Sequence, residues 1–209
     1  MGLTLHYNAS IRDKALIPKL IEEVEDICQS MNWQHKIRDD VMEVGAAHLP
    51  FEPVPGDPKP LHLQGITFTP PGCETVSLLF APSGRITSYI NLIAADAYPD
   101  PEMVYSVHVK TQFAGPDLHV ALVMLLKHLE KKYLKDMEVF DEGDYWNTMD
   151  KAVLQHHFDN HTALINAFRS ALEEETFSPE EDADAIANKI MQIIRKFLRE
   201  GGNQDFPSS

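Results

Sequence analysis

Three histidines occupy alternating positions in three segments whose pattern is typical of β-strands. In each segment apolar and polar residues alternate, which puts His6, His62 and His108 on the polar side of the strands. If these strands share one sheet whose apolar side packs on helices, the three imidazoles project from the same opposite face. Neutral imidazoles that converge can bind Zn²⁺ or another divalent transition metal, and a histidine can also act as an acid or base.

Two neighbouring polar residues extend this candidate site. Lys110 and Gln112 alternate with apolar residues in the same segment as His108, so we expect them on the same face. With these side chains the face could bind an anionic or polar ligand in place of a metal. The structural alternative is a partly solvated sheet face, on which histidine, lysine and glutamine are all ordinary residues.

A second pair of histidines, His157 and His161, lies four residues apart in a predicted helix. This spacing puts both rings on one helical face, where they could chelate a metal. However, His161 also falls on the apolar stripe of that helix, and no second H-x-x-x-H motif supplies further ligands. The pattern therefore favours a hydrogen-bonded histidine between helices over a metal site.

Two acidic clusters offer weaker candidates. Residues 141–146, DEGDYW, place three carboxylates beside two aromatic rings and could bind a cation or supply an acid/base pair. We expect instead that Tyr145 and Trp146 anchor the following helices while the acids stay solvated. Glu173, Glu174 and Glu175 end a predicted helix, where negative charge opposes the helix dipole. They could contact a basic protein partner, although a role in solubility is the simpler interpretation.

Standard catalytic signatures are absent from the sequence. It has no P-loop, no G-x-G-x-x-G, no H-E-x-x-H and no G-x-S-x-G. Cys73 has no neighbour that would lower its thiol pKa, so a structural cysteine is expected there. The sequence thus favours a non-enzymatic protein. It predicts no cofactor, although a divalent transition metal stays open at the histidines.

The order of predicted elements indicates an α+β fold. The first 140 residues read as a strand, a helix, several strands, a second helix and a last strand, with strands predicted at 3–7, 33–38, 62–69, 75–80, 104–113 and 137–140 and helices at 13–31 and 116–134. This order favours a two-layer sandwich, in which a largely antiparallel sheet carries both helices on one face. A ferredoxin-like arrangement with extra strands fits best.

Residues 48–62 contain five prolines and predict an extended surface loop, which we interpret as a connector in preference to a lid.

After residue 148 the pattern becomes helical. A helix predicted over 150–175 carries apolar residues at heptad-like spacings of three and four, and a second helix follows to Gly201 after the capping pattern of residues 178–181. We expect an antiparallel helical pair, packed on the core or extending from it. The predicted organisation is an α+β core at 1–148, a helical hairpin at 149–202 and a disordered tail at 203–209.

Charge and composition limit the partners. The 209 residues include 32 acidic and 18 basic side chains, a net charge of −14, which disfavours nucleic acid and anionic membranes. Residues 136–209 hold 16 acids and 6 bases, so that most of the excess negative charge lies in the last third. No stretch has the length and apolar character of a membrane helix or a signal peptide. A cytoplasmic location is expected.

Short motifs resemble those of a known family. The segments GLTLHY at residues 2–7, KTQFAG at 110–115 and DEGDYWNT at 141–148 are similar to motifs of a family of uncharacterised bacterial proteins of unknown function. The resemblance covers about residues 1–150. It implies a bacterial, cytoplasmic protein but no activity and no site residues.

Two functional hypotheses follow from the sequence. The first is a non-enzymatic binding or interaction domain whose helical pair docks a protein partner or a second copy of the chain. The alternative is a small ligand- or metal-binding enzyme that uses the face bearing His6, His62 and His108.

Overall fold

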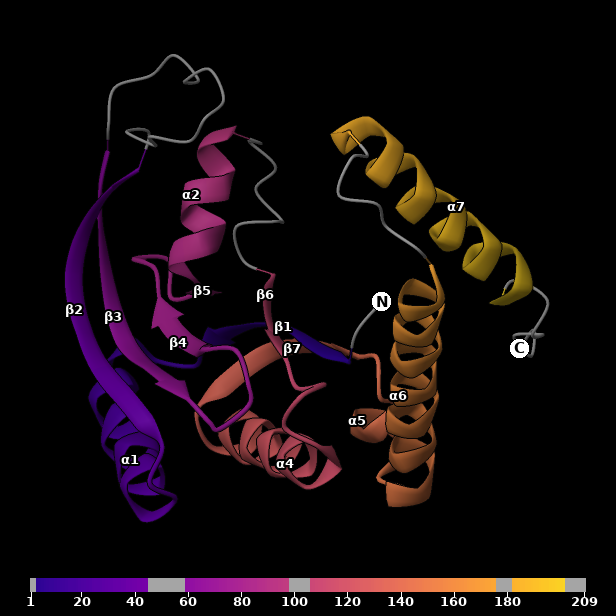
Figure 1. Ribbon diagram of the computed structural model, residues 1–209. Coiled ribbons are helices and arrows are strands. Elements are labelled where there is room, and N and C mark those ends of the chain that lie inside the picture. Colours follow the sequence, from indigo (N-terminus) through magenta and orange to yellow (C-terminus); the bar gives the residue numbers. More distant parts are fainter. Residues whose placement is uncertain (1–2, 45–58, 98–105, 176–181, 202–209) are drawn as a thin grey trace. The chain divides into compact units, whose positions relative to one another are not determined.

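A computed structural model describes residues 3–44, 59–97, 106–175 and 182–201. The chain divides into two compact units, residues 1–158 and residues 159–209 (Figure 1). The first unit contains every strand of the described chain. It therefore holds the sheet histidines that the sequence singles out.

The first of two sheets has three antiparallel strands. β1 (Thr4–Ile11) lies in the middle, between β6 (Val107–Lys110) and β7 (Leu134–Asp141). His6 is directly opposite His108 on β6 and Phe140 on β7. The residues next to His6 on β1, Leu5 and Tyr7, are buried, so His6 itself points to the other face of the sheet.

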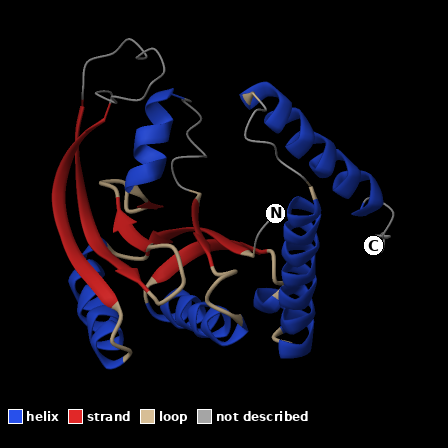
Figure 2. Ribbon diagram, in the orientation of Figure 1, coloured by secondary structure: helices blue, strands red, loops and turns tan. Residues whose placement is uncertain are grey.

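The second sheet has four antiparallel strands in the order β2 (Gln34–Val44), β3 (Lys59–Thr69), β4 (Val76–Phe80) and β5 (Ile86–Thr87) (Figure 2). An isolated bridge between Ser10 and Arg85 connects the end of β1 to it. The buried Tyr7 hydroxyl donates to the Ser77 carbonyl at 2.8 Å and accepts from the Ser77 N–H at 3.1 Å. The two sheets therefore share one core.

Before residue 151, the described residues of the first unit also form five helical segments. They are η1 (Lys14–Leu16), α1 (Ile17–Ser30), α2 (Tyr89–Ala97), α4 (Pro116–Lys132) and α5 (Tyr145–Thr148). α1 and α4 lie side by side on the same side of the first sheet (Figure 1). Their apolar sides join the core through Leu20, Val24 and Cys28 of α1 and Leu122, Leu126 and Leu129 of α4. This burial is the main favourable contribution to folding.

The predicted α+β class with antiparallel strands is confirmed. The ferredoxin-like arrangement is not confirmed, because the strands form two sheets in place of one.

Two single elements differ from the prediction. The described part of β6 ends at Lys110 and residues 112–114 form a turn, whereas a strand was expected to residue 113. Of the proline-rich segment, residues 48–58 lie outside the described residues. Pro60, expected in a loop, belongs to β3 where that strand pairs only with β2, so its missing N–H costs no bond to β4.

Two helices form the last part of the described chain. α6 (Lys151–Glu174) begins in the first unit, where Leu154 and Phe158 are buried, and α7 (Ala183–Gly201) belongs to the second. The predicted capping pattern at 178–181 and the predicted tail at 203–209 lie outside the described residues. None of the described helices combines the length and the apolar character needed to cross a membrane.

Candidate functional site

Two of the three predicted histidines meet on the first sheet. The His6 and His108 rings have their centroids 5.9 Å apart, with 38° between the ring planes. His6 is half-buried and His108 is exposed. The second neighbour of His6 is Phe140, whose ring centroid is 5.8 Å away and whose residue is 65% exposed. A row of three rings thus crosses β6, β1 and β7 on the face opposite to α1 and α4.

His62 does not belong to this row. It lies on β3 in the other sheet, where its Nε2 is 2.5 Å from Oδ1 of Asp39 on β2. The condition that the three strands share one sheet is not met, because β3 pairs with β2 and β4. Among the described residues no group of three or more His, Cys, Asp or Glu side chains is arranged to hold a metal ion.

Lys110 and Gln112 differ in their surroundings. Lys110 is exposed and lies directly opposite Thr4, next to the histidine pair. Its backbone N–H donates to the Glu74 carboxylate at 3.1 Å. Gln112 lies in the turn after β6, where its Oε1 is buried without a hydrogen-bond partner among the described residues. Lys110 therefore extends the candidate site, whereas Gln112 is separated from it by the turn.

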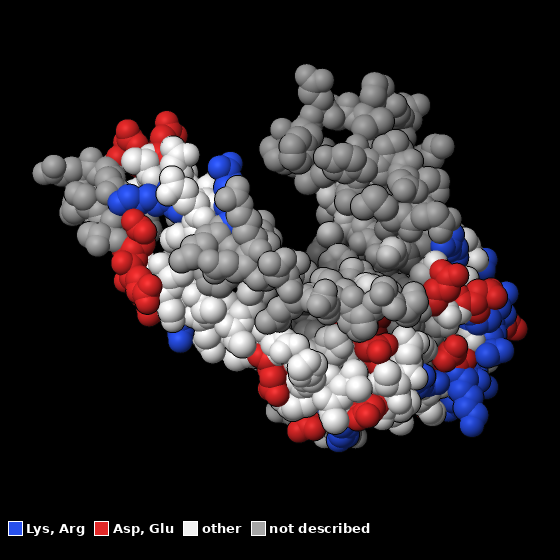
Figure 3. Space-filling view, turned by 90° about the vertical axis from the view of Figure 1, so that its right-hand side faces the viewer, with Lys and Arg blue, Asp and Glu red and all other residues white. Residues whose placement is uncertain are grey.

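The helix-borne candidates stay predictions. His157 and His161 lie one turn apart on α6, and both are half-buried. The acids at the end of α6 have nearby basic residues, with Glu173 3.9 Å from Arg169 and Glu175 3.6 Å from Lys189. Glu174 is exposed. Figure 3 likewise shows acidic and basic side chains of the described residues close to one another on the face in view.

A buried polar network, which the sequence reasoning missed, lies between α4 and the first sheet. His119 Nδ1 is 2.8 Å from the Thr111 hydroxyl, and His119 Nε2 is 3.1 Å from Oδ1 of Asp141. The His119 and Asp141 side chains have no solvent exposure. One feature of the sequence indicates this network: His119 lies on the apolar side of a predicted helix, and a histidine buried there needs a polar partner.

Asp141 organises the loop that follows β7. Its two carboxylate oxygens accept the backbone N–H groups of Gly143 at 2.7 Å and Trp146 at 2.8 Å. Burial raises the pKa of this carboxyl, but the hydrogen bond from His119 and these backbone donors outweigh it, so the pKa lies below its ordinary value. The expectation that all acids of residues 141–146 are solvated is therefore wrong for Asp141, whereas Tyr145 is buried, as an anchor would be.

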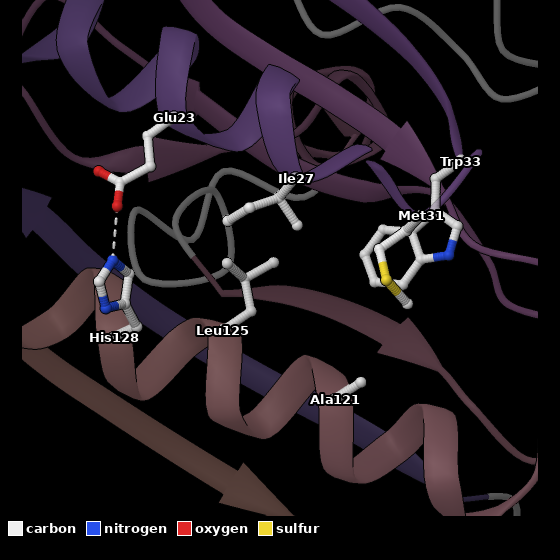
Figure 4. Close-up of a pocket in the computed structure, with 7 residues that line it drawn as sticks. All are labelled: Glu23, Ile27, Met31, Trp33, Ala121, Leu125 and His128. Carbon is white, nitrogen blue, oxygen red and sulfur yellow. Dashed lines mark hydrogen bonds and ion pairs between the residues drawn. The ribbon is translucent and has the colours of Figure 1, made fainter. Parts of the chain in front are cut away.

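An apolar groove separates α1 from α4 (Figure 4). It has a volume of about 460 Å³ and is lined by Glu23, Ile27 and Met31 of α1, Trp33, and Ala121, Leu125 and His128 of α4. Glu23 closes one end. Its carboxylate binds His128 Nε2 at 2.7 Å, Lys132 Nζ at 2.6 Å and the Tyr133 hydroxyl. This cluster ties α1 to α4.

The Glu23 cluster makes stability depend on pH. Burial raises the pKa of Glu23, but hydrogen bonds from Lys132, Tyr133 and His128 outweigh it and lower the pKa to about 2 from an ordinary 4.5. A carboxyl with a lowered pKa stabilises the fold above its unfolded pKa and loses this contribution as the pH falls toward its folded pKa. We expect the urea midpoint to fall between pH 4.5 and about 2, and to fall less steeply in Glu23→Gln. Equal slopes for both proteins would contradict this prediction, and Glu22→Gln on the same helix is the control.

Neither cysteine is activated. Burial, together with the nearby Glu74, raises the pKa of the Cys73 thiol to about 11, and burial with Glu25 does the same for Cys28. Both thiols are therefore protonated at neutral pH, which supports the structural interpretation of Cys73.

Comparisons with protein-family models, with curated proteins and with solved structures found no match for this chain. The resemblance of residues 1–150 to a bacterial family stays a prediction. The function is therefore argued from the described residues.

Proposed function

We propose that this protein is a non-enzymatic interaction protein, cytoplasmic and without affinity for nucleic acid, that self-associates through the apolar stripe of α6. The observation that carries the proposal is the change in exposure along that stripe. Leu154 and Phe158 are buried in the first unit, whereas Ile165, seven residues after Phe158, is 43% exposed. Leu164 beside it is 41% exposed, and Met191 on α7 is 45% exposed.

The spacing of this stripe supports a helical partner. Leu154, Phe158, His161, Ile165, Phe168 and Leu172 follow one another at intervals of four and three. Such a heptad-like repeat suits packing against another helix. Ile165 is exposed and Phe168 and Leu172 are half-buried, so a partner that covers these side chains removes further apolar surface from water. A second copy presents the same stripe and so forms a symmetric contact.

The chemistry of the remaining groups supports a binding protein more than an enzyme. Both thiols have raised pKa values, and the His119–Asp141 pair has no solvent exposure. A catalytic group needs access to a substrate. The histidine face of the first sheet is the second candidate, and it offers ligand binding.

Self-association is expected to depend on Ile165. The full chain should elute as a dimer in size-exclusion chromatography with light scattering at micromolar concentrations, and Ile165→Asp should elute as a monomer. A carboxylate in an apolar contact loses hydration without a partner, which opposes association. Asn166→Asp is the matched control, since it adds the same charge on a neighbouring face of the helix.

Two results would contradict the proposal. The wild-type chain could be a strict monomer over the whole concentration range, or Asn166→Asp could dissociate the dimer as effectively as Ile165→Asp. Circular dichroism of both variants checks that α6 is still helical.

A further inference from the structure

We propose that His6 and His108 together form a two-histidine site for a divalent transition metal such as Zn²⁺ or Cu²⁺ on the open face of the first sheet. The site is independent of self-association through α6. Water would complete the coordination, because the described residues provide no group of three ligands. Imidazole nitrogens suit these ions, and the affinity order favours Cu²⁺ over Zn²⁺.

The geometry of the pair allows one ion to bind both rings. Metal–nitrogen bonds of ~2 Å place the centroids of two imidazoles on one ion roughly 4.5–6.5 Å apart. The observed separation of 5.9 Å lies within this range. The cross-strand register holds the two side chains directly opposite each other, so only side-chain rotation is needed.

The ring nitrogens of this pair are available for a ligand. His35, His62, His119 and His128 each have a hydrogen-bond partner, namely the Trp33 carbonyl, Asp39, Thr111 with Asp141, and Glu23. Within the described residues His6 and His108 have ring contacts but no hydrogen bond or ion pair. His6 and His108 therefore differ from His35, His62, His119 and His128, because both rings of the pair lack a polar partner among the described residues.

The surrounding charges favour a cation over an anion. Glu142, the residue after β7, lies close enough to β1 to accept the Thr4 N–H, and Glu138 on β7 lies opposite Asn8. Thr4 and Asn8 are each two residues from His6 along β1. Glu74 accepts the N–H of Lys110. Three carboxylates thus lie near the pair, against two cations, Lys110 and Arg85, whose guanidinium is 3.4 Å from Oδ1 of Asn8. A metal ion is therefore attracted, and the anionic ligand is disfavoured.

The test is a titration of the full chain with Zn²⁺ by isothermal calorimetry and with Cu²⁺ by electron paramagnetic resonance. We expect one site whose spectrum shows nitrogen ligands. His108→Gln should weaken binding at least about tenfold, because the remaining imidazole loses the benefit of the second one held beside it. His6→Gln should do the same, and the double variant should lose little more, since both rings serve one ion.

Matched controls separate this site from the other histidines. His62→Gln and the double variant His157→Gln/His161→Gln should bind the metal as the wild type does. The proposal is overturned if His108→Gln retains wild-type affinity or if the His157/His161 variant loses it. Lys110→Met distinguishes the ligand classes: tighter or unchanged metal binding supports a cation site. Phosphate binding that Lys110→Met abolishes, without any metal binding, would overturn it.

Discussion

Replacing Asp141 with alanine is expected to lower the free energy of unfolding by about 3–5 kcal/mol. The substitution removes the acceptor for His119 and for the N–H groups of Gly143 and Trp146 in one step. The His119 ring and the two N–H groups then stay buried without an acceptor. The free energy of desolvation of each such group exceeds the net free energy that its hydrogen bond contributed. Urea denaturation at pH 7 measures the effect.

Glu138→Ala provides the matched control for Asp141→Ala. Glu138 is on the same strand, but it is exposed, so its loss should change stability by no more than about 0.5 kcal/mol. If Asp141→Ala were equally mild, the His119–Asp141 network would have no structural role. A double-mutant cycle with His119→Ala should show strong coupling, because the two side chains share one interaction.

The same variant has a pH signature. The pKa of Asp141 lies below its ordinary value of 3.8, so its contribution is fully present above about pH 4 and is lost as the pH falls further. We expect Asp141→Ala to differ most from the wild type near neutral pH and to approach it in acid. A difference that stays constant down to pH 2 would assign the loss to packing.

Gly65→Ala is the second substitution with a large expected effect, a loss of roughly 2–6 kcal/mol from backbone strain and overpacking together. Gly65 lies in β3 with φ of +156°, and an added Cβ would be 2.0 Å from the Leu78 carbonyl oxygen on β4. The clash is with backbone in the middle of a sheet, so no side-chain rotation relieves it. Thermal unfolding by calorimetry measures the loss.

Gly115→Ala separates the two causes of this effect. Gly115 has φ of +87°, but nothing lies within 4 Å of an added Cβ. Its substitution should therefore cost only the backbone strain of about 1–3 kcal/mol. If both variants lost the same stability, the close approach of β3 to β4 would contribute nothing.

The local elements followed from the sequence because their signals are local. A period of two predicted β1 around Leu5 and Tyr7, and a period near 3.6 predicted α1. Pro116 after Gly115 predicted the start of α4 at the residue where it begins. Pro60 was the exception, since β3 pairs with β2 alone at this residue, and a strand position without a neighbouring strand on one side tolerates a proline.

The candidate site was predictable only in part. Alternation put His6 and His108 on the polar side of their strands, and this is correct. It put His62 on the polar side of a strand too, but side-chain period carries no information about which strands pair. The His119–Asp141 network joins residues 22 apart, and the apolar surroundings of His119 were the only local sign of it.

What the sequence by itself determined is the α+β class, the location of most helices and strands, the face of the strand on which His6 and His108 lie and the excess of negative charge in the last third. These depend on residue type and short-range periodicity. Only the tertiary structure decided that His6 meets His108 and not His62, and that Asp141 is buried beside His119. Strand order and burial arise from packing between residues far apart in the chain, which short-range periodicity does not encode. That packing brings His6 and His108 together and places His62 in the other sheet.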